Sequence, residues 1–177
     1  MKKTLLSLVL VLALCASASA QTGWKVVPVD DQSQLDNVVF AGVGLSDKFE
    51  KPSWKIGLAS RLGTKPAGKF DLSLWGIGHI QAYGDTLVDN YNIEGGTMAV
   101  LSYKNAYAGV FLQGGQNIDD LDLHSIMTGS VGCLGGFMAP IPELEIWIGL
   151  GGYVRRYAPI NGNAGFTEAG THITIGL

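Results

Sequence analysis

The stretch FDLSLWGIGHI, Phe70–Ile80, decides the fold, because apolar side chains alternate along it with polar or aromatic ones. One face carries Phe70, Leu72, Leu74 and Ile80, and the other carries Asp71, Ser73, Trp75 and His79. A period of two residues is that of a β-strand. Three further segments, Trp54–Leu62, Glu143–Arg155 and His172–Leu177, alternate in the same way. The sequence therefore predicts long strands that each have one apolar face.

The whole sequence contains eight segments that are rich in β-branched and aromatic residues and are bounded by glycine or proline. Such segments are typical of β-strands, so we predict eight strands. They are Asp36–Leu45, Trp54–Leu62, Lys69–Ile80, Gly95–Tyr103, Ala106–Gly115, Ile126–Met138, Glu143–Arg155 and Gly165–Leu177. Most are longer than the usual strand of about 5–6 residues. Segments of about 9–11 residues are long enough to cross a bilayer when tilted.

The connections between these strands alternate in length. The long, polar ones are Ser46–Ser53, Gln81–Glu94, Gln116–Ser125 and Arg156–Ala164. The short ones are Gly63–Gly68, Lys104–Asn105 and Ala139–Pro142. An even number of strands joined in this order places all short turns and both ends of the strand array at one end. This is the layout of an outer-membrane barrel, with short periplasmic turns and longer outside loops.

The composition excludes two classes of protein. Charged residues make up 15% of the chain, against a usual ~25%, and the mean hydropathy is +0.24. A disordered chain needs high charge and few apolar residues, so disorder is excluded. The formal net charge of −3 disfavours nucleic-acid binding, which needs a basic surface.

A membrane barrel and a soluble β-sandwich both show alternation, and the polar faces of the strands distinguish them. A sandwich turns that face to bulk water and carries many charged side chains on it. Here the face holds mostly Gly, Ala, Ser and Thr, which suit the narrow interior of an eight-stranded barrel. In lipid such a sheet must close, because an open edge leaves backbone groups unpaired. We therefore predict an all-β fold, a closed antiparallel eight-stranded up-and-down transmembrane β-barrel.

The N-terminal residues predict export. Lys2 and Lys3 precede an apolar run and the small-residue site that ends at Ala20, so residues 1–20 are interpreted as a cleaved signal peptide. Residues 21–35 form a short periplasmic lead or an additional strand, and residues 36–177 form the barrel. After cleavage Cys133 is the one cysteine left, which excludes an intrachain disulfide.

Charged residues on the strands must face the lumen. Lys55 or Arg61 turned toward lipid would cost about 2–4 kcal/mol near the midplane. Asp71, Glu143 and Glu145 offer opposite charges on the inward faces. The alternatives are an interior ion-pair network built from some of these five residues, or charges that are hydrated individually in a wet lumen.

Aromatic residues beside the short turns fit an interfacial girdle. They are Phe70, Tyr103, Tyr107 and Phe137, with Trp54 near the opposite rim. Aromatic side chains are enriched at both membrane–water interfaces. Their positions therefore support the prediction that the strand ends lie at the two surfaces of the membrane.

The last predicted strand, EAGTHITIGL, resembles the C-terminal insertion signal of outer-membrane β-barrel proteins. The matching positions are Glu168, Gly170, Ile173, Ile175 and Leu177. The family usually ends in Phe or Trp where this chain has Leu177. Together with the strand count, the chain looks like the small eight-stranded class of OmpA-transmembrane, OmpX and opacity-protein type. The resemblance implies a Gram-negative outer membrane with its lipid and lipopolysaccharide, and delivery by periplasmic chaperones to the barrel assembly machinery.

Few residues suggest chemistry. His79 and His172 fall on inward faces, where hydrogen bonding within the lumen is the expected role. His124 and Ser125 follow the acidic run Asp119–Asp122 in a predicted loop, and we interpret this run as a solvated loop without a metal. Outer-membrane lipid A deacylases use His and Ser on one strand with a His-x-Ser spacing, which is absent here. We expect no catalytic residues, no cofactor and no metal.

The leading hypothesis is a non-enzymatic integral outer-membrane β-barrel, monomeric, with a structural, adhesive or host-interaction role through four extracellular loops. One alternative is a soluble exported β-barrel or sandwich that binds an apolar ligand. A second is a lipid-modifying outer-membrane barrel enzyme.

Overall fold

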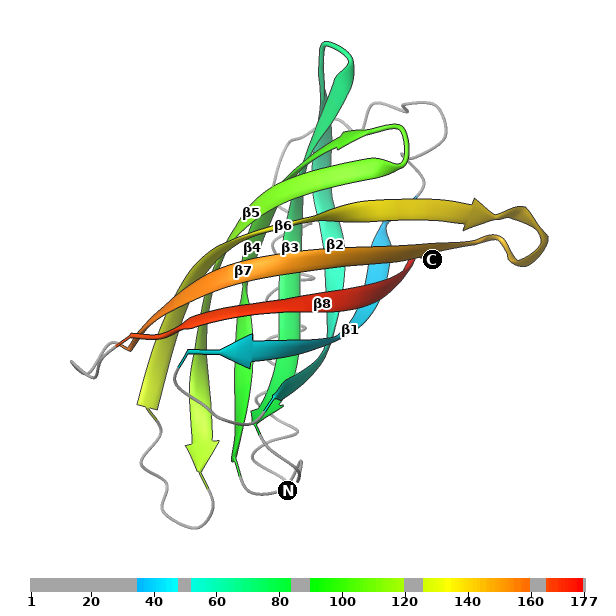
Figure 1. Ribbon diagram of the computed structural model, residues 1–177. Helices are drawn as coiled ribbons and strands as arrows, with labels where there is room; N and C mark the ends of the chain where they lie inside the picture. The colour runs from blue at the N-terminus through cyan, green and yellow to red at the C-terminus, as the bar shows by residue number, and fades with distance from the viewer. Residues whose placement is uncertain (1–34, 48–51, 84–89, 120–125, 160–164, 177) are drawn as a thin grey trace.

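The protein is a closed, eight-stranded antiparallel β-barrel, which confirms the predicted fold class (Figure 1). The computed structural model describes residues 35–47, 52–83, 90–119, 126–159 and 165–176. The strands are β1 Asn37–Ser46, β2 Ser53–Ala67, β3 Phe70–Tyr83, β4 Asn90–Tyr103, β5 Ala106–Asp119, β6 Ile126–Ile141, β7 Ile146–Pro159 and β8 Thr167–Gly176. Residues 1–34, to which the signal peptide and most of the periplasmic lead were assigned, lie outside the described residues.

Each strand pairs with its neighbours in sequence, and β1 closes the barrel against β8 from Val38↔Gly176 to Ser46↔Glu168. The turns after β2, β4 and β6 are short and lie along the upper and right-hand side of Figure 1, where β8 also ends. We call this the short-turn end. The opposite end, at which β1, β3, β5 and β7 end, is called the long-loop end.

The seventh strand begins later than predicted. Pro142–Leu144 form a short 3₁₀ turn, η1, and Glu145 follows it with a left-handed φ of 53°, so β7 starts at Ile146. Proline fixes its own φ and has no N–H to give to a β-ladder, so Pro142 favours a turn over a strand.

The strands reach further toward the long loops than predicted. β3 continues to Tyr83, β4 begins at Asn90 and β7 ends at Pro159. The added residues include Gln81 and Asn92, which are buried on the inward face. The sequence analysis assigned them to a loop because they are polar. The interior of a membrane barrel is itself polar, so polar side chains can continue a strand there.

Exposed apolar side chains surround the barrel, and every strand contributes to them. They are Val39, Val43, Leu45, Trp54, Ile56, Phe70, Leu72, Leu101, Tyr103, Val110, Leu112, Val131, Phe137, Ile148, Leu150, Val154, Ile173 and Ile175. We call these residues the apolar belt. The predicted girdle members Phe70 and Tyr103 contact each other, with ring centroids 5.4 Å apart, and are exposed.

Inward-facing residues fill the lumen in two different ways. A buried apolar cluster occupies the half next to the short turns and includes Leu35, Val38, Phe40, Ala59, Trp75, Ile77, Met98, Val100 and Phe111. Polar and charged side chains occupy the half next to the long loops. Because side chains alternate along each strand, one sequence places an apolar belt outside and this divided core inside.

Candidate functional site in the barrel lumen

A buried arginine joins two glutamates that come from different walls of the barrel. Arg155 Nη1 donates to Glu94 Oε2 at 2.9 Å, and its Nη2 lies 3.2 and 3.1 Å from Glu168 Oε1 and Oε2. These side chains are at most 1% exposed. Arg155 and Glu168 are register partners on β7 and β8, whereas Glu94 comes from β4. We call these three residues the charged cluster.

Hydroxyl and amide groups satisfy the outer oxygens of these carboxylates. Tyr157 Oη lies 2.7 Å from Glu94 Oε1. Gln81 Nε2 donates to Glu168 Oε2 at 2.6 Å, and the hydroxyl of Tyr153 donates to Glu168 Oε1. A buried ion pair is favourable only when its remaining polar atoms also find partners. Side chains of β3 and β7 supply them to the carboxylates, whereas Arg155 Nε has no hydrogen-bond partner among the described residues.

His79 lies beside the charged cluster, as its predicted inward orientation requires. Its Nε2 is 3.4 Å from Glu94 Oε2 and 3.3 Å from Arg155 Nη1, and its Nδ1 is 3.2 Å from Gln113 Nε2. Both ring nitrogens therefore have polar neighbours within the lumen. The geometry describes a histidine that belongs to a packed polar network.

Lys55 adds a second positive charge to this half of the lumen. Its Nζ lies 2.9 Å from the centroid of the Tyr153 ring, in the position of a cation–π contact. Lys55 and Arg155 thus balance Glu94 and Glu168 in formal charge. Such pairing is what permits ionised groups to remain buried.

Two inward glycines leave room for these side chains. A Cβ added to Gly44 would lie 2.5 Å from Glu168 Oε1, and one added to Gly151 would lie 2.6 Å from His172 Nε2. Real Cβ atoms do not approach other atoms this closely. At these two positions, therefore, only glycine leaves enough space for the neighbouring side chains.

The five residues predicted to form a lumen network have different positions in the structure. Lys55 lies in the polar half. Arg61 faces inward and pairs with Asp36, with 2.7 Å between Nη2 and Oδ1. Asp71 lines the same cavity as Arg61.

Glu143 and Glu145 lie outside the lumen, so their prediction as interior charges is wrong. Both are exposed on the turn between β6 and β7. The expected alternation began at Glu143, but the 3₁₀ turn at Pro142 breaks it. The interior ion pairs use other carboxylates.

Sequence reasoning missed the charged cluster as a unit. Glu94 was assigned to a loop, Arg155 closed a predicted strand, and Glu168 was interpreted only as part of the insertion signal. The parity of the strands contained the information, because Arg155 shares a face with Trp147 and Glu168 shares one with His172.

The remaining residues of the insertion signal lie as the alternation requires. Ile173 and Ile175 are exposed on the outer face of β8, and Gly170 faces inward beside Tyr153. Leu177 lies outside the described residues. A role of these residues in assembly stays a prediction.

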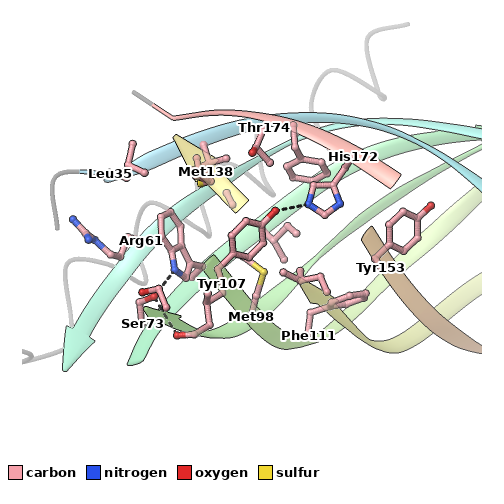
Figure 2. Close-up of a pocket in the computed structure, with 18 of the residues that line it drawn as sticks. Leu35, Arg61, Ser73, Met98, Tyr107, Phe111, Met138, Tyr153, His172 and Thr174 are labelled. Atoms are coloured by element: carbon pink, nitrogen blue, oxygen red, sulfur yellow. Dashed lines mark hydrogen bonds between the residues drawn. The ribbon is translucent and has the colours of Figure 1, made fainter. Parts of the chain in front are cut away.

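An apolar cavity of about 140 Å³ occupies the short-turn half of the lumen (Figure 2). Its apolar lining consists of Leu35, Val38, Phe40, Ala59, Trp75, Ile77, Met98, Val100, Phe111, Leu134, Met138 and Trp147, with Ala106 beside the turn. At roughly 24 cal/mol per Å³, a void of this size corresponds to about 3 kcal/mol of packing energy. The lumen thus holds a network of ion pairs and hydrogen bonds in one half and an unfilled apolar cavity in the other.

A hydrogen-bonded pair lies where the two halves meet, and the cavity lining continues past it to Lys55, His79 and Gln113. Tyr107 Oη lies 2.9 Å from His172 Nε2, and the Tyr153 ring lies next to the same histidine, with centroids 6.3 Å apart. Figure 2 shows Arg61 and Leu35 at one end of the cavity, and Tyr153, which also lines it, on the far side of the pair. Tyr107 was predicted to join the outer girdle, but its odd-numbered position on β5 shares the inward face with Phe111.

The described residues contain no group of three or more His, Cys, Asp or Glu side chains placed to hold a metal ion. His124, Ser125 and most of the acidic run Asp119–Asp122 lie outside the part of the chain that the structure describes. Within that part, no helix is long and apolar enough to cross a membrane.

Comparison with known proteins shows a likeness of structure. No protein-family model and no curated protein sequence matches the chain. A solved structure titled as the crystal structure of the outer membrane enzyme PagL is similar, with a TM-score of 0.52 and 11% sequence identity. The match covers 77% of this chain and 97% of that chain. At this identity the likeness concerns the fold, which is that of an outer-membrane barrel.

Proposed function

We propose that the protein is a non-enzymatic integral outer-membrane β-barrel, whose lumen is closed by the charged cluster and whose long loops project from the cell surface. The observation that carries the proposal is the apolar belt, to which all eight strands contribute. Monomeric soluble proteins rarely expose continuous apolar surface of this extent. Lipid is the solvent in which such a surface is stable.

The distribution of exposed charge supports the same placement. Lys65, Lys104 and Glu143 are exposed near the short turns, and Asp47 and Arg156 are exposed near the long loops. The apolar belt lies between these two charged rims. This is the pattern expected for a barrel that spans a bilayer with its ends in water.

The sequence of the last strand and the number of strands support a finer assignment. The OmpA, OmpX and opacity-protein type, an adhesive or structural role of the loops, and assembly by the barrel machinery with periplasmic chaperones follow from the resemblance of the last strand. Contact with lipopolysaccharide and a monomeric state belong to the same proposal.

Membrane location is tested by fractionation and gel migration. We expect the protein to stay in the envelope fraction until detergent is added, because exposing the apolar belt to water costs free energy in proportion to its area. The extracted protein should migrate differently on SDS gels before and after boiling, since a closed barrel resists unfolding. Recovery in the soluble periplasm without detergent would instead support the exported apolar-ligand carrier.

The lipid-modifying alternative is favoured by one observation, the similarity to a structure described as an outer membrane enzyme. Against it, both described histidines, His79 and His172, face the lumen and lie within hydrogen-bond distance of polar neighbours there. We expect His124→Ala and Ser125→Ala to leave lipid A composition, measured by mass spectrometry, unchanged from wild type. A changed acylation pattern in either variant would overturn the non-enzymatic assignment.

A further inference from the structure

We propose that the cavity in the short-turn half of the lumen binds an uncharged alkyl chain of about six carbons. The proposal goes beyond a closed structural barrel, because it assigns a ligand to the interior. It rests on the size of the cavity, the chemistry of its lining and the state of the charged groups around it.

The size of the cavity fits a small hydrocarbon. Its volume of about 140 Å³ is close to that of the ~150 Å³ apolar cavity that stays dry and binds benzene in a well-studied lysozyme variant. The walls are formed by aromatic and aliphatic side chains from several strands, among them Phe40, Ile77 and Phe111. An alkyl chain would recover the missing packing contacts along these apolar walls. The hydroxyls of Thr64 and Thr174, which have no hydrogen-bond partner among the described residues, are the points of the lining that would hold water.

The elongated shape of the cavity favours an alkyl chain as the ligand. The cavity extends from the rim at Leu35 and Arg61 past the Tyr107–His172 pair to Tyr153 (Figure 2). Met98 contributes an unbranched, polarisable side chain along this path, and such side chains adapt to ligands of different lengths. A hydrocarbon that enters from the short-turn end would lie along the barrel axis.

The charged groups that line the cavity point to a neutral ligand. Arg61 already pairs with Asp36, and Asp71 lies on the same lining. Lys55, at the inner end, contacts the Tyr153 ring. A carboxylate head group would compete with Asp36 and be repelled by Asp71, and it would also lose its hydration. An uncharged alkyl compound encounters none of these costs.

Bromoalkane quenching of tryptophan tests the proposal in the intact protein. Trp75 lines the cavity, whereas Trp54 is 51% exposed on the outer face. One variant retains only Trp75 and another only Trp54, with the other tryptophans changed to Phe, both in lipid nanodiscs. We expect 1-bromohexane to quench Trp75 with saturation, and to quench Trp54 linearly, as partitioning into lipid requires. If the Trp75 variant does not fold, a variant that retains only Trp147, which also lines the cavity, replaces it.

Two comparisons make the result specific. Ala59→Leu fills the cavity from a side chain that is 3% exposed and should weaken the saturable binding at least tenfold, whereas Ala41→Leu on the outer face of β1 should leave it unchanged. 6-Bromohexanoate should bind at least tenfold more weakly than 1-bromohexane. Linear quenching of Trp75 with the slope seen for Trp54, no effect of Ala59→Leu, or equal binding of the carboxylate would each overturn the proposal.

Discussion

Arg155→Met is expected to lower the free energy of unfolding by about 3–5 kcal/mol, the range for removing one partner from a buried ion pair. The variant leaves the carboxylates of Glu94 and Glu168 buried with Lys55 as the remaining positive charge nearby. Both carboxylates are at most 1% exposed in the intact protein, so water cannot replace the guanidinium without opening the lumen. Urea titration of the protein in lipid vesicles, followed by gel migration of the folded form, measures the change.

The neighbouring residue provides a matched control for Arg155. Arg156 points outward, and its Nη1 lies 3.8 Å from Asp47 Oδ2, with both side chains more than half exposed. Exposed ion pairs contribute about 0–1 kcal/mol, so Arg156→Met should have little effect. Combining Arg155→Met with Glu94→Gln alone leaves Lys55 and Glu168 to balance each other in formal charge, and should restore much of the lost stability. Equal effects of the two arginine substitutions would show that the charged cluster does not stabilise the barrel.

Leu150→Arg is expected to destabilise the barrel by about 2–4 kcal/mol, which is the cost of an arginine on the lipid face near the midplane. Leu150 is 64% exposed and is paired with Ile173 on β8, so its side chain lies within the apolar belt. In a soluble barrel the same substitution would exchange an exposed leucine for an exposed arginine at almost no cost. Reversible unfolding from vesicles therefore tests the membrane placement through a single side chain.

Leu144 is the matched control for this substitution. It is 63% exposed, close to the value for Leu150, but it lies on the turn between β6 and β7. The penalty for arginine falls to about 0–1 kcal/mol near the interfaces, so Leu144→Arg should be tolerated. A similar and small effect at both positions would contradict a bilayer around the belt.

The strand number and the closed barrel could be predicted from the sequence because apolar and polar residues alternate along the strands. Strands such as β3 and β8 turn the expected side chains inward and outward, and the short turns fall where proline, glycine or a Lys-Asn pair interrupts the pattern. The start of β7 could not be predicted by alternation, because the pattern runs on through Glu143 while Pro142 enforces a turn. Local backbone chemistry prevails over periodicity there.

The charged cluster could not be assembled from the sequence for a different reason. Parity shows that Arg155 faces inward, but the partner across the lumen depends on the tilt and stagger of the strands, which hydropathy does not specify. Glu94 and Gln81 were assigned to a loop because polar residues at the end of an apolar segment usually mark one. Inside a barrel the same residues continue the strand, and only the closed geometry brings them to Arg155.

The placement of two opposite charges on the final hairpin has a consequence for the order of assembly. Arg155 and Glu168 face each other on β7 and β8, so they can neutralise one another before the sheet seals. Glu94, by contrast, belongs to a strand that is synthesised much earlier and receives its cation only when that hairpin arrives. A nascent sheet that ends at β6 would hold Glu94 without the guanidinium that lies 2.9 Å from it in the complete barrel, so closure of the barrel is favoured over a partly assembled sheet.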